Sequence, residues 1–379
     1  MISRPAITSI EPTVLKAEHM STLSPPGLYP GEGLIHIADA PCIYRFFPAD
    51  KKKPLIVLIP GGAHNARIFY GGHRGYDSDD FLASWLVKDG FGVLGISYPL
   101  QSEPELMPPV APAFRIHQWG KQAAEVTKAV VDANSLCGDI VLVCWSMGGR
   151  LLVPYCKLAR GLGLNVKLFV SLAATPGLAG IRPVPPGLRS TPSGYATFPA
   201  MLGLFTAQIR EQQQLNHDKC ITPEGVYRSE YFGHTPVSLL GWGYRFDGMS
   251  EFADDGGDSV RDAEAHNVGS LPWISSLTPT SQLDARHVLS DKATWAFLMT
   301  QRLTLDFEKK ARSIPTDSFR WMNIRLFVES APGTLSAPVT GNHYFFLGKS
   351  GAKATAKGIA RHLSTATALE SRWCELLGD

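Results

Sequence analysis

The chain has 379 residues, of which 44% are hydrophobic and 18% charged, and its formal net charge is +2. These values predict a globular protein with a sizeable core, and they exclude a charge-driven affinity for nucleic acid or anionic membranes. The longest apolar runs are too short to span a bilayer, and the N-terminus lacks an apolar segment of signal-peptide length. The cysteines form no CxxC pair, so we expect no zinc site, no disulfide framework and a cytoplasmic location.

The first half of the chain alternates between predicted strands and predicted helices. Residues 1–32 lack periodicity and carry several prolines, which predicts an irregular arm. The strands expected next are an edge hairpin at 34–37 and 42–47, followed by buried strands at 55–59, 91–98, 140–145 and 166–172. A short helix beginning near Ser78 and an amphipathic helix over 114–133 lie between them. This alternation, with strands apolar on both faces, predicts a mostly parallel sheet covered by helices on both sides.

Ser146 directly follows the apolar run 140–145, in the stretch C-W-S-M-G-G. A buried strand that ends at a serine before a glycine-rich helix start is typical of a nucleophile elbow, G-x-S-x-G. Here Cys144 occupies the first glycine position. The alternative is a serine that only caps the following helix.

The regular alternation stops after the predicted strand 166–172. Proline, glycine and aromatic residues crowd the stretch from about 176 to 272. A segment of this length without clear periodicity inside a compact domain is usually functional. We therefore expect residues 178–292 to form an inserted cap, between the two parts of a core made of residues 33–177 and 293–379.

The C-terminal part of the chain returns to regular patterning. Leu303 and Phe307 lie on one face of an expected helix, and residues 323–328 predict a strand that ends at Glu329. A short β-like piece at 335–340 precedes the loop that carries His343, and a final helix closes the chain.

A serine nucleophile needs a histidine beside its hydroxyl and a carboxylate that orients the histidine. His343 is the expected base, because it lies in a loop between a sheet element and the last helix. The acid should follow a strand between Ser146 and His343. Glu329 is the first choice for this role. Asp284 is the alternative, in which case residues 271–277 form the strand and 294–314 the following helix.

Two backbone N–H groups should stabilise the developing oxyanion. One is expected from Met147, the residue after the nucleophile, and the other from Gly62 or Ala63 in the glycine turn after strand 55–59. His64 beside this turn is expected to contact substrate or to shape the loop. No lysine follows the glycines at P-loop spacing, so a phosphate site is not expected.

The C-W-S-M-G-G stretch, the P-G-G turn at 60–62 and the G-N-H stretch at 341–343 occur in an order that resembles the α/β-hydrolase superfamily. The resemblance covers residues 33–177 and 293–369. Residues around Ser146 and the stretch P-V-T-G-N-H-Y-F also resemble thioesterase domains that release acyl chains from carrier proteins. The sequence departs from the family at Cys144, where glycine is usual, and at Pro60, where many members have histidine.

This resemblance implies an α/β-hydrolase fold with a large inserted cap and a serine hydrolase activity. The expected reaction is cleavage of an ester or thioester of an apolar small molecule through an acyl-Ser146 intermediate, without a metal or an organic cofactor. Two alternatives remain open from the sequence. One is a non-hydrolytic acyltransferase, cyclase or carbon-carbon lyase in a biosynthetic pathway, and the other is a non-catalytic ligand-binding relative of the hydrolases.

Overall fold

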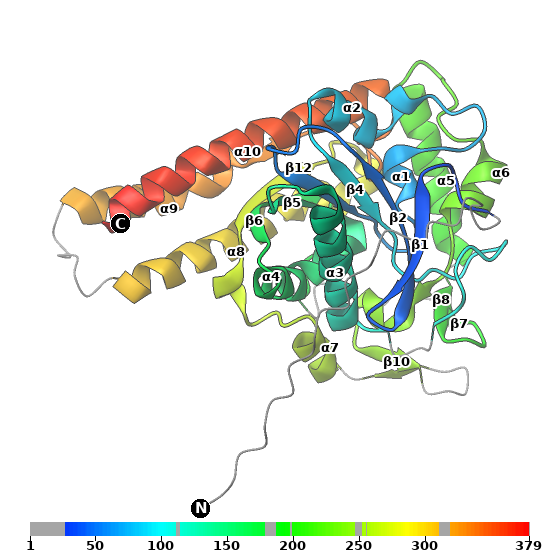
Figure 1. Cartoon of the computed structure of the whole chain (residues 1–379), viewed down its shortest axis with the longest axis horizontal. Coiled ribbons are helices and arrows are strands. Elements are labelled where there is room, and N and C mark those ends of the chain that lie inside the picture. The colour runs from blue at the N-terminus through cyan, green and yellow to red at the C-terminus, as the bar shows by residue number, and fades with distance from the viewer. Residues whose placement is uncertain are drawn as a thin grey trace, which may run out of the picture.

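An eight-stranded sheet lies at the centre of the computed structural model, which describes residues 27–110, 114–178, 187–197, 199–246, 252–254, 256–310 and 319–378. Figure 1 shows this twisted sheet with helices packed around it. The strand order is β1-β2-β4-β3-β5-β6-β12-β13. Its strands are β1 (Glu32–Ile37), β2 (Ala40–Phe47), β3 (Leu55–Ile59), β4 (Val93–Ile96), β5 (Asp139–Trp145), β6 (Asn165–Leu172), β12 (Trp273–Thr278) and β13 (Ser336–Pro338).

The sheet is parallel from β4 through β13 and antiparallel only at the β1-β2-β4 edge. Every residue of β3 is buried, as expected for a strand covered on both faces. The predicted edge hairpin is also confirmed. Its turn residues Ala38 and Asp39 both have positive φ, 51° and 60°, which matches the right-handed twist of the paired strands. The predicted α/β architecture is therefore confirmed.

Helices cover both faces of the sheet (Figure 1). On one face, α2 (Leu82–Lys88) packs against α10 (Lys349–Leu377), and on the other α3 (Ile116–Asn134) packs against α4 (Leu152–Gly161). The buried side of α3 includes Trp119, Ala123 and Val130, which agrees with the predicted amphipathic pattern. Asp77, and not Ser78, caps the short helical turn η2 (Ser78–Asp80) that precedes α2.

The long insertion between β6 and β12 forms the expected cap. Its helices are α5 (Pro199–Gln214), α6 (Glu224–Val226) and α7 (Gly256–Asp262), with short turns η4 (Tyr227–Tyr231), η5 (Val237–Leu240) and η6 (Val268–Ser270). Its strands β7 (Arg189–Ser190), β8 (Tyr195–Thr197) and β9 (Thr235–Pro236) form one small sheet, and β10 (Tyr244–Phe246) and β11 (Phe252–Asp254) form another. The expected range 178–292 extends too far, because β12 within it pairs with β6 and β13 of the central sheet.

The C-terminal part contains a further correction. Residues 323–328 are not a strand, because they lie within the helix α9 (Phe319–Thr334). The buried residues of α9 are Ile324, Phe327 and Ala331, at steps of three and four, which is the spacing of a helix face. The segment was expected to be a strand because it is rich in aromatic and β-branched residues.

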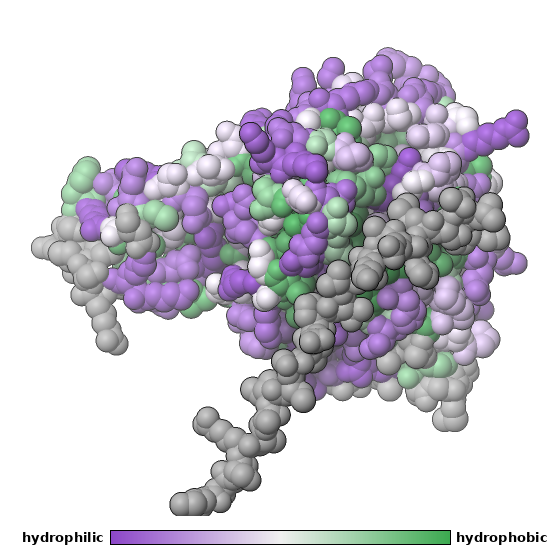
Figure 2. All heavy atoms as spheres, viewed as in Figure 1, coloured by the Kyte–Doolittle hydropathy of each residue, from purple (hydrophilic) through white to green (hydrophobic). Residues whose placement is uncertain are grey.

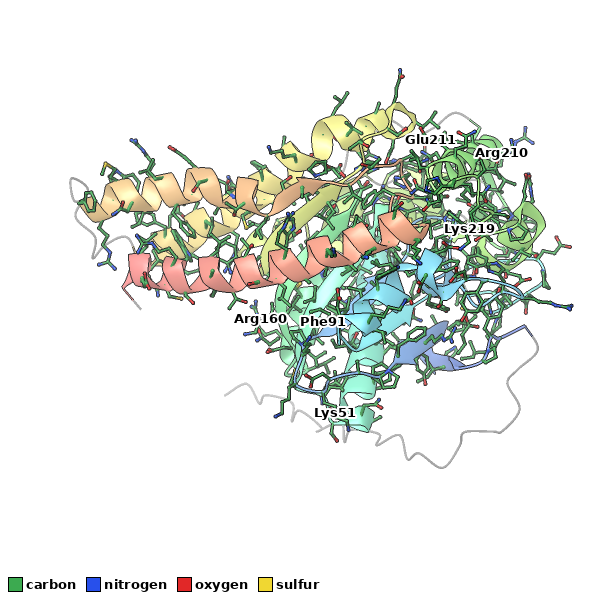
Figure 3. The ribbon with its side chains drawn as sticks, turned by 90° about the horizontal axis from the view of Figure 1, so that it is seen from above. Lys51, Phe91, Arg160, Arg210, Glu211 and Lys219 are labelled. Carbon is green, nitrogen blue, oxygen red and sulfur yellow. The ribbon has the colours of Figure 1, made fainter. Side chains whose placement is uncertain are left out.

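The helix α8 (Ala285–Lys310) follows β12, and its outer part projects from the sheet together with α9 and α10 (Figures 1 and 3). Figure 2 shows hydrophobic side chains near the free end of this projection, where Phe319 and Met322 of α9 are exposed. Within the described ranges, no helix is both long and apolar enough to cross a membrane.

Candidate active site

Ser146 directly follows β5 and is the first residue of the turn η3 (Ser146–Leu151), which continues into α4. Its φ of 52° is in the left-handed region, which is uncommon for residues other than glycine. A serine held in this conformation at a strand-to-helix turn has the geometry of a nucleophile elbow. The side chain is half-buried and lines a cavity.

Glycines around the elbow permit close backbone approach. A Cβ atom added to Gly61 would lie 2.6 Å from the Ser146 Cβ, and one added to Gly148 would lie 2.9 Å from the Pro60 carbonyl oxygen. Both distances are shorter than a normal contact, so glycine is required at these positions. Cys144, at the position of the missing glycine, is fully buried in β5, where burial raises the pKa of its thiol well above the usual range. The thiol therefore stays protonated and acts as a small core side chain.

His343 follows β13 and is paired with Asp284, not with Glu329. The His343 Nδ1 lies 2.8 Å from the Asp284 Oδ2, and both residues are buried and line the same cavity as Ser146. Glu329 is on α9, with 62% of its side chain exposed, and its partner among the described residues is Arg325, in an ion pair at 3.6 Å. The first expectation for the acid is therefore wrong, and the alternative is the residue beside the histidine.

The position of Asp284 follows from the strand that precedes it. β12 ends at Thr278, and the turn η7 (Gln282–Asp284) then leads into α8. Ser281 caps this turn by accepting a hydrogen bond from the Leu283 N–H. Asp284 thus lies at the carboxyl edge of the parallel sheet, the same edge at which β5 presents Ser146.

The His343 loop is held from two sides. The indole Nε1 of Trp145, next to the nucleophile, donates to the His343 carbonyl oxygen at 2.9 Å. Asn342 donates through its Nδ2 to the Glu211 carboxylate of α5 at 2.7 Å. The same carboxylate accepts from the Ser281 hydroxyl at 2.7 Å. Glu211, labelled on α5 in Figure 3, therefore connects the loop of the histidine to the turn of the aspartate.

Two glutamines of α5, on either side of Glu211, make similar contacts. Gln208 donates to the Leu283 carbonyl at 3.0 Å, and Gln212 donates to the Leu347 carbonyl at 2.9 Å. Because α5 belongs to the cap, the cap is bonded directly to both loops that carry the histidine and the aspartate.

The glycine turn after β3 has most of its backbone polar groups occupied. The Gly61 carbonyl accepts from the Tyr98 hydroxyl at 3.0 Å. The Ala63 N–H donates to the Thr235 Oγ1 at 2.8 Å, and the Ala63 carbonyl accepts from the Gly233 N–H at 3.0 Å. Ala63 is therefore not an available donor, contrary to one of the two expectations for this turn.

Gly62 is the remaining candidate donor in the turn. Across the described residues, its N–H donates to no protein acceptor. A Cβ atom added to Gly62 would lie 3.5 Å from the Met147 Sδ, so the two backbone segments run close together. Met147 stands at the start of η3, where the first N–H groups of a helix lack intrahelical acceptors. Gly62 and Met147 thus bring two backbone N–H groups to the surroundings of Ser146.

His64 shapes this turn and does not line the cavity. Its Nδ1 is 2.7 Å from the Gly62 carbonyl, which can only accept, so Nδ1 carries the proton. Its Nε2 then accepts from the hydroxyl of Tyr227, at 2.6 Å. Complete burial lowers the pKa of His64 to about 3, so the ring is neutral at physiological pH. This neutral ring fixes the orientation of the Gly62 peptide.

The cavity above Ser146 has a volume of about 350 Å³. Its apolar lining comes mainly from the cap and includes Met147, Met201, Leu204, Phe205, Phe232 and Leu240. Polar side chains, among them Arg150, Gln208 and Arg286, also reach it. A cavity of this size and lining suits a small, largely apolar molecule with a few polar groups.

A second histidine, His287, lines the same cavity. Its Nδ1 lies 2.9 Å and 3.0 Å from the two carboxylate oxygens of Asp291, one helical turn further along α8. Possible metal-ligand atoms of Asp284, His287 and His343 lie within 4.8 Å of one another. These are the described residues that could hold a metal ion. In this arrangement, however, the Nδ1 atoms of both histidines face carboxylates as hydrogen-bonding partners.

Sequence reasoning missed several residues of the site. A signal for His287 and Asp291 was present, because a histidine and an aspartate four residues apart share a helix face. Thr235 and Glu211 gave no such signal, since their partners are far away in the chain, 172 residues for Thr235 and 70 and 131 residues for Glu211.

The alpha/beta hydrolase family model matches residues 56–339 of the chain. No curated protein matches it in sequence. Among solved structures, a hyperthermophilic esterase from Pyrobaculum calidifontis is 16% identical with a TM-score of 0.46, over 88% of this chain and 83% of that one. A putative lipase from Sulfolobus solfataricus is 13% identical with a TM-score of 0.49, over 89% and 99% of the two chains. A thermophilic esterase from Thermogutta terrifontis is 13% identical with a TM-score of 0.46, over 88% and 98%.

Proposed function

Since the chain belongs to the alpha/beta hydrolase family, we propose that it is a serine hydrolase that cleaves an ester or thioester of an apolar small molecule. One observation carries the proposal. A serine at a left-handed elbow shares a cavity with a histidine whose Nδ1 is bonded to a buried aspartate. This is the set of groups that acyl transfer through a serine requires.

In the proposed mechanism, Ser146 Oγ attacks the acyl carbon and its proton passes to His343. Asp284 holds the imidazole in the tautomer with the proton on Nδ1 and stabilises the imidazolium that forms. The acyl group is then bound to Ser146, and water releases it as a carboxylic acid. No step of this reaction needs a metal or an organic cofactor.

The oxyanion formed in each half-reaction is assigned to the N–H groups of Gly62 and Met147. Support for Gly62 comes from the hydrogen bonds of the turn. The Ala63 N–H is bonded to Thr235, whereas the Gly62 N–H has no protein acceptor among the described residues. His64 and Thr235 keep the donor in place without contacting the substrate oxygen themselves. Loss of one such donor typically lowers kcat by about 100- to 1,000-fold.

The activity of Ser146 can be tested with a fluorophosphonate probe, which reacts with activated serines. The wild-type protein should be labelled at Ser146, and Ser146→Ala should abolish labelling and lower ester turnover by about 1,000-fold or more. Ser84→Ala is a matched control, since Ser84 lies on α2, outside the cavity lining. Absence of wild-type labelling, or activity of Ser146→Ala comparable to wild type, would exclude this function.

A further inference from the structure

Asp284, His287 and His343 bring three possible metal ligands together. Their ligand atoms all lie within 4.8 Å of one another, and the three residues are 9%, 3% and 7% exposed. The bonds from Zn²⁺ to nitrogen or oxygen are about 2.0–2.1 Å long, so neighbouring ligands of a tetrahedral ion lie about 3.3 Å apart. Side-chain rotations that move each ligand atom by about 1 Å would therefore bring all three to one ion.

The donor set of two imidazoles and one carboxylate favours zinc. Imidazole nitrogen is a good ligand for Zn²⁺, whereas Mg²⁺ and Ca²⁺ prefer oxygen ligands. Zinc accepts two histidines and a carboxylate and leaves its fourth position to water or another ligand. All three residues line the cavity, so an ion that enters the cavity reaches them directly.

Asp291 supports this donor set from the next turn of α8. Its two carboxylate oxygens lie 2.9 Å and 3.0 Å from the His287 Nδ1, and it is buried. A histidine that binds a metal commonly donates its other ring N–H to a carboxylate, which fixes the ring and makes it a stronger ligand. His287 can therefore bind an ion through Nε2 without loss of its contact with Asp291. Asp284 and Asp291 also place two buried carboxylates at the site, which favours a divalent cation.

We propose that Asp284, His287 and His343 form an inhibitory zinc site. A neutral imidazole has one ring nitrogen with a proton and one with a lone pair. An ion on the His343 Nε2 occupies the lone pair that takes the Ser146 proton, and an ion on Nδ1 leaves the ring proton on Nε2. In both cases His343 no longer accepts a proton from Ser146. The inhibition rests on the proposed serine hydrolase function, whereas the binding of the ion does not.

Calorimetric titration of the metal-free, full-length protein with zinc chloride tests the binding. One ion should bind per chain. His287→Gln should raise the dissociation constant by about 100-fold or more, because a ligand is lost, and Asp291→Asn by about 10- to 100-fold, because the support of that ligand is weakened. Leu289→Ala, an exposed change on the same helix, should bind zinc like wild type. Ser146→Ala should do so too, since it keeps all three ligands.

The rate of fluorophosphonate labelling tests the inhibition. Saturating zinc should abolish labelling of Ser146, and excess EDTA should restore it. In His287→Gln and Asp291→Asn, the zinc concentration that halves the labelling rate, relative to the zinc-free rate of the same variant, should rise by the same factor as the dissociation constant. Cys137 and Cys220 are exposed thiols that also have affinity for zinc. The double variant Cys137→Ser/Cys220→Ser should therefore be inhibited like wild type.

The outcomes separate this inference from the function on which the inhibition rests. Absence of zinc binding, or equally tight binding to His287→Gln, would overturn the site. Binding that leaves labelling unchanged, or zinc that increases ester turnover, would overturn the inhibitory role. A wild-type protein that is not labelled even without zinc would instead overturn the proposed function, and calorimetry would still decide whether the three residues hold the ion.

Discussion

At the scale of single residues, the assignment of the acid depends on one hydrogen bond. Asp284 and Glu329 both lie between Ser146 and His343 in the sequence, and both were plausible from chain order. The structure places the Asp284 carboxylate 2.8 Å from His343 and leaves Glu329 on an exposed helix face. Only the first can hold the imidazole in the tautomer that accepts a proton from serine.

Substitution of the two acids therefore gives opposite expectations. Asp284→Asn should lower kcat by at least about 100-fold with little change in stability, since the amide keeps the volume and loses the charge. Glu329→Gln should leave kcat within about twofold, because an exposed ion pair contributes little. Steady-state kinetics with one p-nitrophenyl ester would check both. A strong effect of Glu329→Gln would contradict the assignment.

At the scale of elements, α5 stands out because it joins the cap to the reacting residues. A cap that only covers the substrate would contact it from above. Here Glu211 of α5 accepts hydrogen bonds from Ser281 and Asn342, which flank the aspartate and the histidine. The cap helix is therefore a positioning element, and its loss should affect kcat more than KM.

The matched pair Glu211→Leu and Arg210→Gln tests this view. Glu211→Leu removes the carboxylate that accepts from the Ser281 hydroxyl and one of the two acceptors of the Asn342 amide, and it should lower kcat by about 10- to 100-fold through displacement of the two loops. The rate of fluorophosphonate labelling should fall in parallel, with a smaller change in KM. Arg210, the neighbouring residue, bonds the exposed Glu224 and should tolerate substitution. A lowered melting temperature with unchanged kcat would show that Glu211 serves stability alone.

Local sequence patterns predicted the strands and helices of the core. They failed where contacts between distant parts of the chain determine the structure. β3 and β5 are runs of apolar residues with a single favourable location, a sheet covered on both faces. The elbow at Ser146 follows from β5 and the glycines after it. In α9, by contrast, strand-forming residue types occur at helical spacing, and the spacing prevailed. The predicted strand at 323–328 is the reason why the sequence favours Glu329 over Asp284 as the acid.

At the scale of the whole molecule, two buried histidines link stability to pH. His64 lies under the glycine turn, and His362 of α10 contacts Ser275 of β12, with its Nδ1 2.6 Å from the serine hydroxyl. Burial lowers the pKa of His64 to about 3. Burial and the nearby charge of Arg361 lower the pKa of His362 to about 4. In the unfolded chain, both would titrate near the ordinary histidine value of about 6.5.

These pKa values determine the sign of the effect. Between pH 6.5 and the folded-state values, the unfolded chain binds protons that the folded chain does not, so acidification favours unfolding. For His362 alone, the free energy of unfolding should fall by about 2 kcal/mol between pH 7 and pH 5. The effect disappears at higher pH, where the ring is neutral in both states.

His362→Gln separates this contribution from that of His64 without touching the cavity. The free energy of unfolding, measured by urea denaturation at pH 7 and pH 5, should fall by about 2 kcal/mol less in the variant than in the wild-type protein. Lys357→Ala, an exposed change on the same helix, should show the wild-type loss. If His362→Gln also shows the full loss, the ring of His362 must take up its proton between pH 7 and pH 5 in the folded protein as it does in the unfolded chain. α10 and β12 would then have to accommodate a charge that their packing is expected to exclude.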